Sequence, residues 1–206
     1  MPDNEKEGQN AASEKKKRRR TPLFHPCNDL CSANINPKGG GTSLCSAPKG
    51  EDMKFSVGYR LTADGEWFRC LLTEKEHLKE IYFPWTGFSS GREETAPEGL
   101  SPFDAEAEKR RELKALHDAG IGMNLLLNGN CYGRDSLSRA FFLRLGDTLD
   151  EVTDTLGVSS VTTTSPVIAK FIGQNFGDLE VRASVNMEIG TPEGMTYLSE
   201  WFDAYY

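Results

Sequence analysis

The hydrophobic pattern of the chain switches repeatedly between the short apolar runs typical of strands and the longer periodic segments typical of amphipathic helices. Apolar or β-branched runs predict strands at residues 55–59, 80–85, 122–128, 159–164 and 179–185, and residues 203–206 resemble the start of a sixth strand. Helical patterns lie between them at residues 66–78, 104–119, 136–156, 166–176 and 191–202. Strands that alternate with helices in this way run parallel, because each crossover helix returns the chain to the same end of the sheet.

Several helix ends carry recognisable start and stop residues. Gly120 and Gly157 follow two of the helical patterns and are suited to C-terminal caps. Pro166 is suited to the first turn of a helix, and Thr191 is suited to an N-cap with Pro192 behind it. These signals support the predicted order of the elements.

A parallel α/β chain of this kind forms either a barrel or an open sheet. A complete eight-unit barrel needs about 250 residues, whereas residues 53–206 hold five βα units and the start of a sixth strand. We therefore predict an α/β fold with a parallel (β/α) barrel of TIM type that is incomplete. The alternative is a complete, doubly wound open sheet, although the first βα turn, GYRLTADG, lacks the GxGxxG fingerprint of a dinucleotide site.

Residues 1–52 differ in composition from the rest of the chain. They are polar and carry nine lysines or arginines against seven acidic residues, which gives +2 and leaves −9 of the total net charge of −7 for residues 53–206. We predict a disordered tail before a barrel domain at 53–206. The tail holds an uninterrupted basic block, which is either a solvated segment or a nuclear-localisation or nucleic-acid patch. The block consists of Lys15, Lys16, Lys17, Arg18, Arg19 and Arg20.

The cysteines and the hydropathy of the chain indicate whether the protein binds metal and where in the cell it is located. His25, Cys27, Cys31 and Cys45 could supply a zinc site, but their spacing lacks paired knuckles, so we predict no metal site. Five cysteines in a long chain do not form the paired framework of a small secreted domain. No secretory signal or apolar run long enough to span a membrane is present, and the expectation is a cytoplasmic protein.

Ligands of parallel α/β folds bind beyond the carboxyl ends of the strands, so polar and aromatic residues there are the site candidates. Cys131 is a candidate nucleophile, although a half-buried loop cysteine is the simpler interpretation, and His77 and His117 fall at the ends of predicted helices. Asn128 and Asn130 could orient a ligand carbonyl or amine. Further candidates for substrate binding are Arg92, whose planar fork suits carboxylate or phosphate, and Trp85, Tyr59 and Asn186.

Three segments, KEIYFPWTGFSSGRE, GIGMNLLLNGNCYG and LEVRASVNMEIGTPEGMTYL, together resemble the barrel half of the collagenase-like peptidase family, peptidase group U-32. In that family a strand with a tyrosine-rich end precedes a loop with Gly and Arg, a helix ending HxxGI, and a strand leading to an Asn-containing turn. The resemblance covers residues 53–206 and implies a TIM-like barrel. By position it singles out Arg92, Asn128, Asn130 and Cys131.

The family includes peptidases described as degrading collagen and proteins that hydroxylate transfer RNA, ribosomal RNA or ubiquinone precursors without oxygen. Some members hold an iron-sulfur cluster through four cysteines in the later part of their chain, which has no counterpart among these residues. The resemblance therefore implies an N-terminal barrel portion without the cluster ligands, inactive alone and completed by a missing C-terminal half or a partner chain that covers the open strand edges. Two alternatives stay open: a nucleic-acid-binding module that uses the basic block on an α/β scaffold, and a complete open-sheet enzyme for a small substrate.

Overall fold

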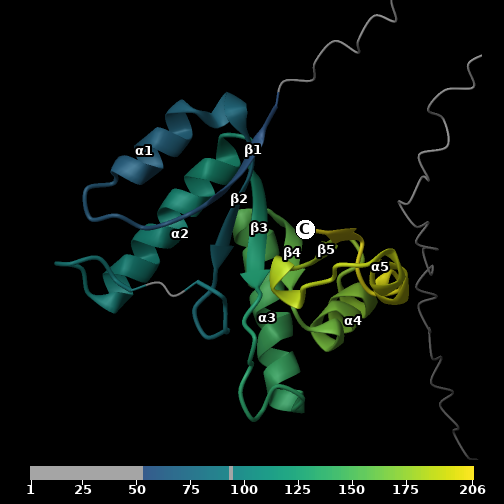
Figure 1. Ribbon diagram of the computed structural model, residues 1–206. Helices are drawn as coiled ribbons and strands as arrows, with labels where there is room; N and C mark the ends of the chain where they lie inside the picture. The colour runs from purple at the N-terminus through teal and green to yellow at the C-terminus, as the bar shows by residue number, and fades with distance from the viewer. Residues whose placement is uncertain (1–52, 93–94) are drawn as a thin grey trace, which may run out of the picture.

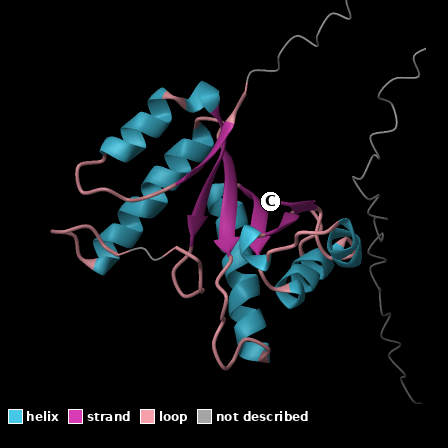
Figure 2. Cartoon of the chain, viewed as in Figure 1, coloured by secondary structure: helices cyan, strands magenta, loops and turns pink. Residues whose placement is uncertain are grey.

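The computed structural model describes residues 53–92 and 95–206, which form one curled parallel sheet with helices around it (Figures 1 and 2). Its strands are β1 (Phe55–Gly58), β2 (Leu78–Pro84), β3 (Gly122–Leu127), β4 (Val158–Thr163), β5 (Glu180–Ala183) and β6 (Ala204–Tyr205). The helices are α1 (Glu66–Thr73), α2 (Pro102–Asp118), α3 (Arg139–Leu156), α4 (Pro166–Asn175) and α5 (Pro192–Leu198), with short 3-10 turns η1 (Lys75–His77) and η2 (Val185–Met187). The predicted order of strands and helices is confirmed.

The strands lie in the sheet in their order along the chain, β1-β2-β3-β4-β5-β6, and every neighbouring pair is parallel. Since crossover connections are right-handed, an order that never reverses places the crossover helices on one face of the sheet. A doubly wound sheet needs a reversal of strand order, so the open-sheet alternative is wrong. The fold is a TIM-like α/β half-barrel, as predicted.

The two faces of the sheet differ in chemistry. The face toward the helices is apolar, and Ile81, Phe83, Leu125 and Val161 are fully buried there against helix residues such as Leu113. The alternate positions face the concave inner side, because successive side chains of a strand point to opposite faces. These positions are largely polar and include Glu80, Tyr82, Asn124, Ser160, Thr162 and Arg182. The half-barrel therefore has an apolar outer layer and a polar interior.

The helix boundaries differ from the prediction where strand pairing or turns take over. The helix expected to reach residue 78 ends at Thr73, because Leu78 is buried and pairs with Phe55 as the first residue of β2. The helix expected to reach residue 202 ends at Leu198, since the Asp203 backbone N–H donates to the Val181 carbonyl and aligns the chain with β5.

Other boundaries are displaced by side-chain caps. Helix α3 begins at Arg139 instead of residue 136, because the Ser138 side chain accepts a hydrogen bond from the Phe141 N–H. The predicted caps at Gly157 and Thr191 are confirmed: Gly157 has a left-handed φ of 62°, and the Thr191 hydroxyl accepts from the Gly194 N–H.

Some predictions lie outside the described residues. These are the disordered tail at 1–52, the basic block Lys15–Arg20 and the His25, Cys27, Cys31 and Cys45 group. Within residues 53–92 and 95–206, no helix combines the length and the apolar character that a membrane crossing requires. The cytoplasmic location stays a prediction.

Candidate functional site

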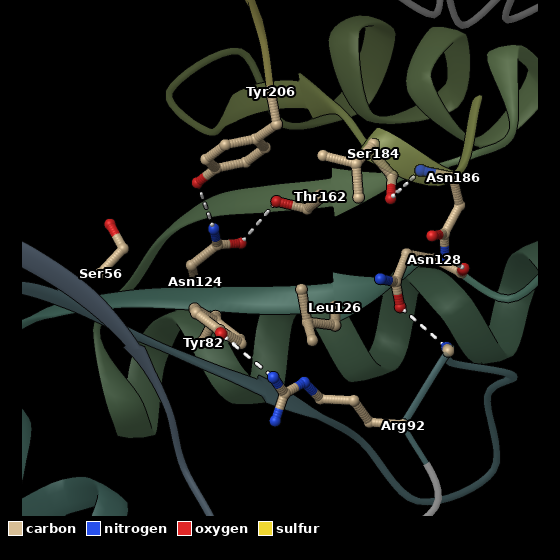
Figure 3. Close-up of a pocket in the computed structure, with 12 residues that line it drawn as sticks. Ser56, Tyr82, Arg92, Asn124, Leu126, Asn128, Thr162, Ser184, Asn186 and Tyr206 are labelled. Atoms are coloured by element: carbon tan, nitrogen blue, oxygen red, sulfur yellow. Dashed lines mark hydrogen bonds between the residues drawn. The ribbon is translucent and has the colours of Figure 1, made fainter. Parts of the chain in front are cut away.

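A cavity of about 330 Å³ opens on the concave inner face of the half-barrel, reaching the carboxyl ends of the strands (Figure 3). Tyr82 comes from β2, Asn124 and Leu126 from β3, and Thr162 from β4. The other lining residues are Ser56, Gly91, Arg92, Asn128, Ser184, Val185, Asn186 and Tyr206. Amide, hydroxyl and guanidinium groups from separate strands and loops therefore surround one space.

Asn128 organises the rim of the cavity. Its Oδ1 accepts hydrogen bonds from the Ser90 hydroxyl at 2.8 Å and from the Gly91 N–H at 3.0 Å, which fixes the loop after β2. Its backbone carbonyl accepts from the Asn186 side-chain amide at 3.1 Å. The Asn128 Nδ2 lies on the cavity side of the side chain in Figure 3, so it can donate to a bound ligand.

Arg92 lies across the ring of Tyr82. Its guanidinium carbon is 4.8 Å from the ring centroid, and Nη2 donates to the Tyr82 hydroxyl at 3.0 Å. Gly58 permits this arrangement, because a Cβ at that position would come within 2.6 Å of the Arg92 Nη1. Stacking on an aromatic ring while the fork stays available for hydrogen bonds is a property of arginine that lysine lacks.

The middle of the cavity is lined by a buried amide. Asn124, 1% exposed, accepts from the Thr162 hydroxyl at 3.1 Å and donates from Nδ2 to the Tyr206 hydroxyl at 3.3 Å (Figure 3). These bonds link β3, β4 and the end of the chain beyond β6. Because both its oxygen and its nitrogen form hydrogen bonds, the Asn124 amide is fixed in one orientation.

An ion pair lies beneath this layer. Arg182 Nη1 donates at 2.7 Å to each carboxylate oxygen of Glu80, and Nη2 donates at 2.7 Å to Glu180. Glu80 also accepts from the Ser56 and Tyr206 hydroxyls. Burial raises the pKa of Glu80, but the hydrogen bonds from Arg182 and Tyr206 outweigh it and leave that pKa below its ordinary value.

The structure brings three of the predicted site residues together. Arg92, Asn128 and Asn186 all line the cavity and are connected through the rim hydrogen bonds. Tyr59 and Trp85 lie elsewhere, because their positions alternate toward the helix-facing core, where they are 2% and 4% exposed. The Tyr59 hydroxyl donates to Glu112 on α2.

Asn130 and Cys131 do not line the cavity but lie exposed in the loop after β3. The Cys131 thiol accepts a hydrogen bond from the Gly133 N–H at 3.4 Å. Neither His77, in η1, nor His117, in α2, is among the residues that line the cavity. A nucleophilic role for Cys131 stays a prediction.

Six lining residues were missed because they lie inside strands or at the end of the chain: Ser56, Tyr82, Asn124, Leu126, Thr162 and Tyr206. A signal was available in the sequence, since residues 80 and 82 in β2 and residues 160 and 162 in β4 are polar at alternate positions, and Asn124 interrupts the apolar run of β3. Period-two polarity marks a second, polar face of a strand. Residues beyond the strand ends therefore form only the rim of the cavity, and polar residues within the strands form its wall.

The described residues do not match a metal or cluster site. No group of three or more His, Cys, Asp and Glu side chains in residues 53–92 and 95–206 could hold a metal ion. The two cysteines in this part of the chain, Cys70 in α1 and Cys131 after β3, are both exposed and cannot supply a four-cysteine set. These residues therefore do not fit a four-cysteine iron-sulfur cluster.

The chain is a TIM-like α/β half-barrel with a largely polar cavity on its concave face, near the carboxyl ends of its strands. The solved structure of the U32 peptidase Mk0906 is similar to this chain, with 22% sequence identity and a TM-score of 0.57. The match covers 81% of this chain and 63% of that one, so the chain spans less than two thirds of the peptidase structure. The U-32-like resemblance is confirmed at the level of the fold.

No family model and no curated protein sequence matches the chain.

Proposed function

We propose that the half-barrel is the substrate-binding part of a U-32 peptidase-like protein and that its ligands are peptides. The observation that carries this proposal is the ring of side-chain amides and hydroxyls on the cavity, with Asn128 and Asn186 at its rim. Peptide groups need both donors and acceptors, and asparagine amides offer both. The fold similarity to a U32 peptidase supports peptides over other polar ligands.

Binding of end-blocked peptides tests the proposal directly. A set of N-acetylated, C-amidated tripeptides should bind the full chain, and Asn128→Asp should weaken binding by about tenfold, because the change removes the Nδ2 donor. The substituted side chain keeps an acceptor for Ser90 and Gly91. Asn175→Asp, on the exposed end of α4, is the matched control and should bind like the wild type. Absence of binding to the wild-type chain would contradict the proposal.

For catalysis we propose that hydrolysis of peptides requires further barrel elements, from the same protein or from a partner chain. The proposal is supported by the sheet, in which β1 and β6 are the two end strands of the described residues and each has one neighbour. Added parallel strands along these edges would close the barrel. Hydrogen exchange of the β1 and β6 amides should slow in a complex that closes the barrel, and unchanged exchange would argue against edge pairing.

A second proposal concerns the basic block Lys15–Arg20, which we propose contacts nucleic acid. Six consecutive cations support it, since they would release counterions from phosphates. Replacing the six residues with glutamine should abolish salt-dependent binding to single-stranded RNA and leave peptide binding unchanged. Equal RNA binding by both proteins would refute this role.

A further inference from the structure

We propose that the cavity selects ligands that carry a carboxylate, and that Arg92 is the residue that determines this specificity. The inference rests on the proposed peptide-binding function and makes it narrower: the ligand enters with its free C-terminal carboxylate. Neutral donors and acceptors around Arg92 would hold the preceding peptide group, and Asn128 Nδ2 is one such donor on the rim.

Charge supports this specificity. Among the described residues that line the cavity, Arg92 alone is charged. The deeper cation, Arg182, is matched by Glu80 and Glu180. Within the described part of the chain, no carboxylate forms an ion pair with Arg92. The cavity therefore holds one positive charge that a ligand can neutralise.

The geometry of Arg92 leaves its hydrogen-bonding fork available. Of its five guanidinium N–H donors, one is used by the Tyr82 hydroxyl among the described residues. The stacking on Tyr82 fixes the plane of the guanidinium, so less conformational entropy is lost when a planar ligand group binds. A carboxylate is planar and accepts two parallel N–H bonds from such a fork.

A carboxylate fits this rim better than a phosphate does. Phosphate sites use several cations or free backbone N–H groups. Here three backbone N–H groups of the rim are already occupied: Gly91 donates to Asn128, Arg92 donates to Ser90, and Asn186 donates to Ser184. A single cation balances the charge of one carboxylate.

The size of the cavity indicates a ligand larger than a lone acid. About 330 Å³ exceeds the space that one carboxylate fills, and the wall beside Arg92 includes Leu126 and the Tyr82 ring. An apolar wall beside a cation suits the side chain of a C-terminal residue. A peptide end matches these surroundings, whereas a small free acid would leave most of the cavity without contacts.

Paired probes test the inference on the full chain by calorimetry. N-acetyl-dialanine with a free carboxylate should bind about tenfold more tightly than its C-terminal amide, because a charge-assisted bond replaces a neutral one. Arg92→Gln should abolish the preference, and Arg92→Lys should restore part of it. Arg144→Gln, at an exposed position of α3, is the matched control and should keep the full preference.

Each contrary result has a distinct meaning. Equal binding of acid and amide would overturn the carboxylate specificity while leaving the peptide-binding function in place. Acetate binding as tightly as the peptide would show a small-acid site and overturn the peptide-end inference, and inorganic phosphate competing equally would overturn the choice of carboxylate. No binding of either peptide would refute both proposals. An unchanged preference in Arg92→Gln would refute the role of Arg92.

Discussion

Arg182 on β5 donates hydrogen bonds of 2.7 Å to both carboxylate oxygens of Glu80 on β2, although β3 and β4 lie between these strands in the sheet. The curl of the sheet brings the two side chains together over its concave face. Gly122 on β3 lets that strand approach β2 closely beside Glu80, because a Cβ there would come within 2.9 Å of the Lys79 carbonyl oxygen and 3.2 Å of the Glu80 Cβ. The ion pair therefore depends on the curvature of the whole half-barrel.

Removing one partner of this pair should be costly. We expect Arg182→Met to lower the free energy of unfolding by about 3 kcal/mol, because Glu80 stays buried without its cation. The double variant Glu80→Gln, Arg182→Met should recover part of the loss. Lys114→Met, which breaks an exposed pair with Asp118, should cost less than about 1 kcal/mol. Urea unfolding measures all three, and equal losses in Arg182→Met and Lys114→Met would contradict the structural role.

The buried Glu112 carboxyl should make the protein less stable as pH rises. Burial raises the pKa of its carboxyl above the ordinary value of 4.5, despite a hydrogen bond from Tyr59. The folded state therefore favours the protonated form, and this contribution to stability is present below the ordinary pKa and is lost as pH rises through the raised pKa.

Glu112→Gln stays neutral at every pH, so its free energy of unfolding should increase relative to wild type as pH rises above the ordinary pKa of 4.5. Glu108→Gln is the control with the opposite sign, because a hydrogen bond from Arg111 lowers the pKa of Glu108. Chemical unfolding from acid to neutral pH measures both differences, because the Glu108 difference develops as pH falls below about 4.5 and the Glu112 difference as pH rises above it. A Glu112→Gln difference that does not change with pH would show that Glu112 titrates normally.

Removing the Thr162 hydroxyl from the inner face should lower the free energy of unfolding, because the Asn124 amide depends on it. Thr162→Val keeps the shape but leaves the buried Asn124 Oδ1 without its donor, which should lower the free energy of unfolding by about 1–3 kcal/mol. Thr162→Ser keeps the hydroxyl and should cost clearly less. If thermal and urea unfolding ranked the two variants in the reverse order, the loss of a methyl group would be the larger effect.

Gly157 should tolerate no side chain. Its φ of 62° is left-handed, and a Cβ there would overlap the His117 ring. Gly157→Ala should therefore cost about 2 kcal/mol or more, since backbone strain and the clash add. Gly177→Ala, where a Cβ meets no atom within 4 Å, should stay within about 0.5 kcal/mol of wild type. Adding His117→Ala to Gly157→Ala should recover only the stability lost through the clash. If no stability is recovered, the whole loss comes from backbone strain.

The candidate site was predictable where residues follow a strand and less so where they lie within one. Arg92, Asn128 and Asn186 come after β2, β3 and β5, and the rule that parallel strands present their carboxyl ends to one edge placed them at a common rim. Tyr59 and Trp85 also follow strands, but they continue the alternate positions whose side chains point into the helix-facing core. To predict whether a residue after a strand reaches the cavity, one must therefore also know whether its side chain points to the concave face or to the helices.

The amino-acid sequence by itself determined the alternation of strands and helices, their parallel direction and the caps at Gly157 and Thr191, because these depend on hydrophobic period and local backbone preference. The tertiary structure alone decided which polar residues meet. Glu80 and Arg182 are 102 residues apart, and Asn124 and Thr162 are 38 apart. Such contacts depend on the curvature of the assembled sheet, which no local pattern of residues encodes.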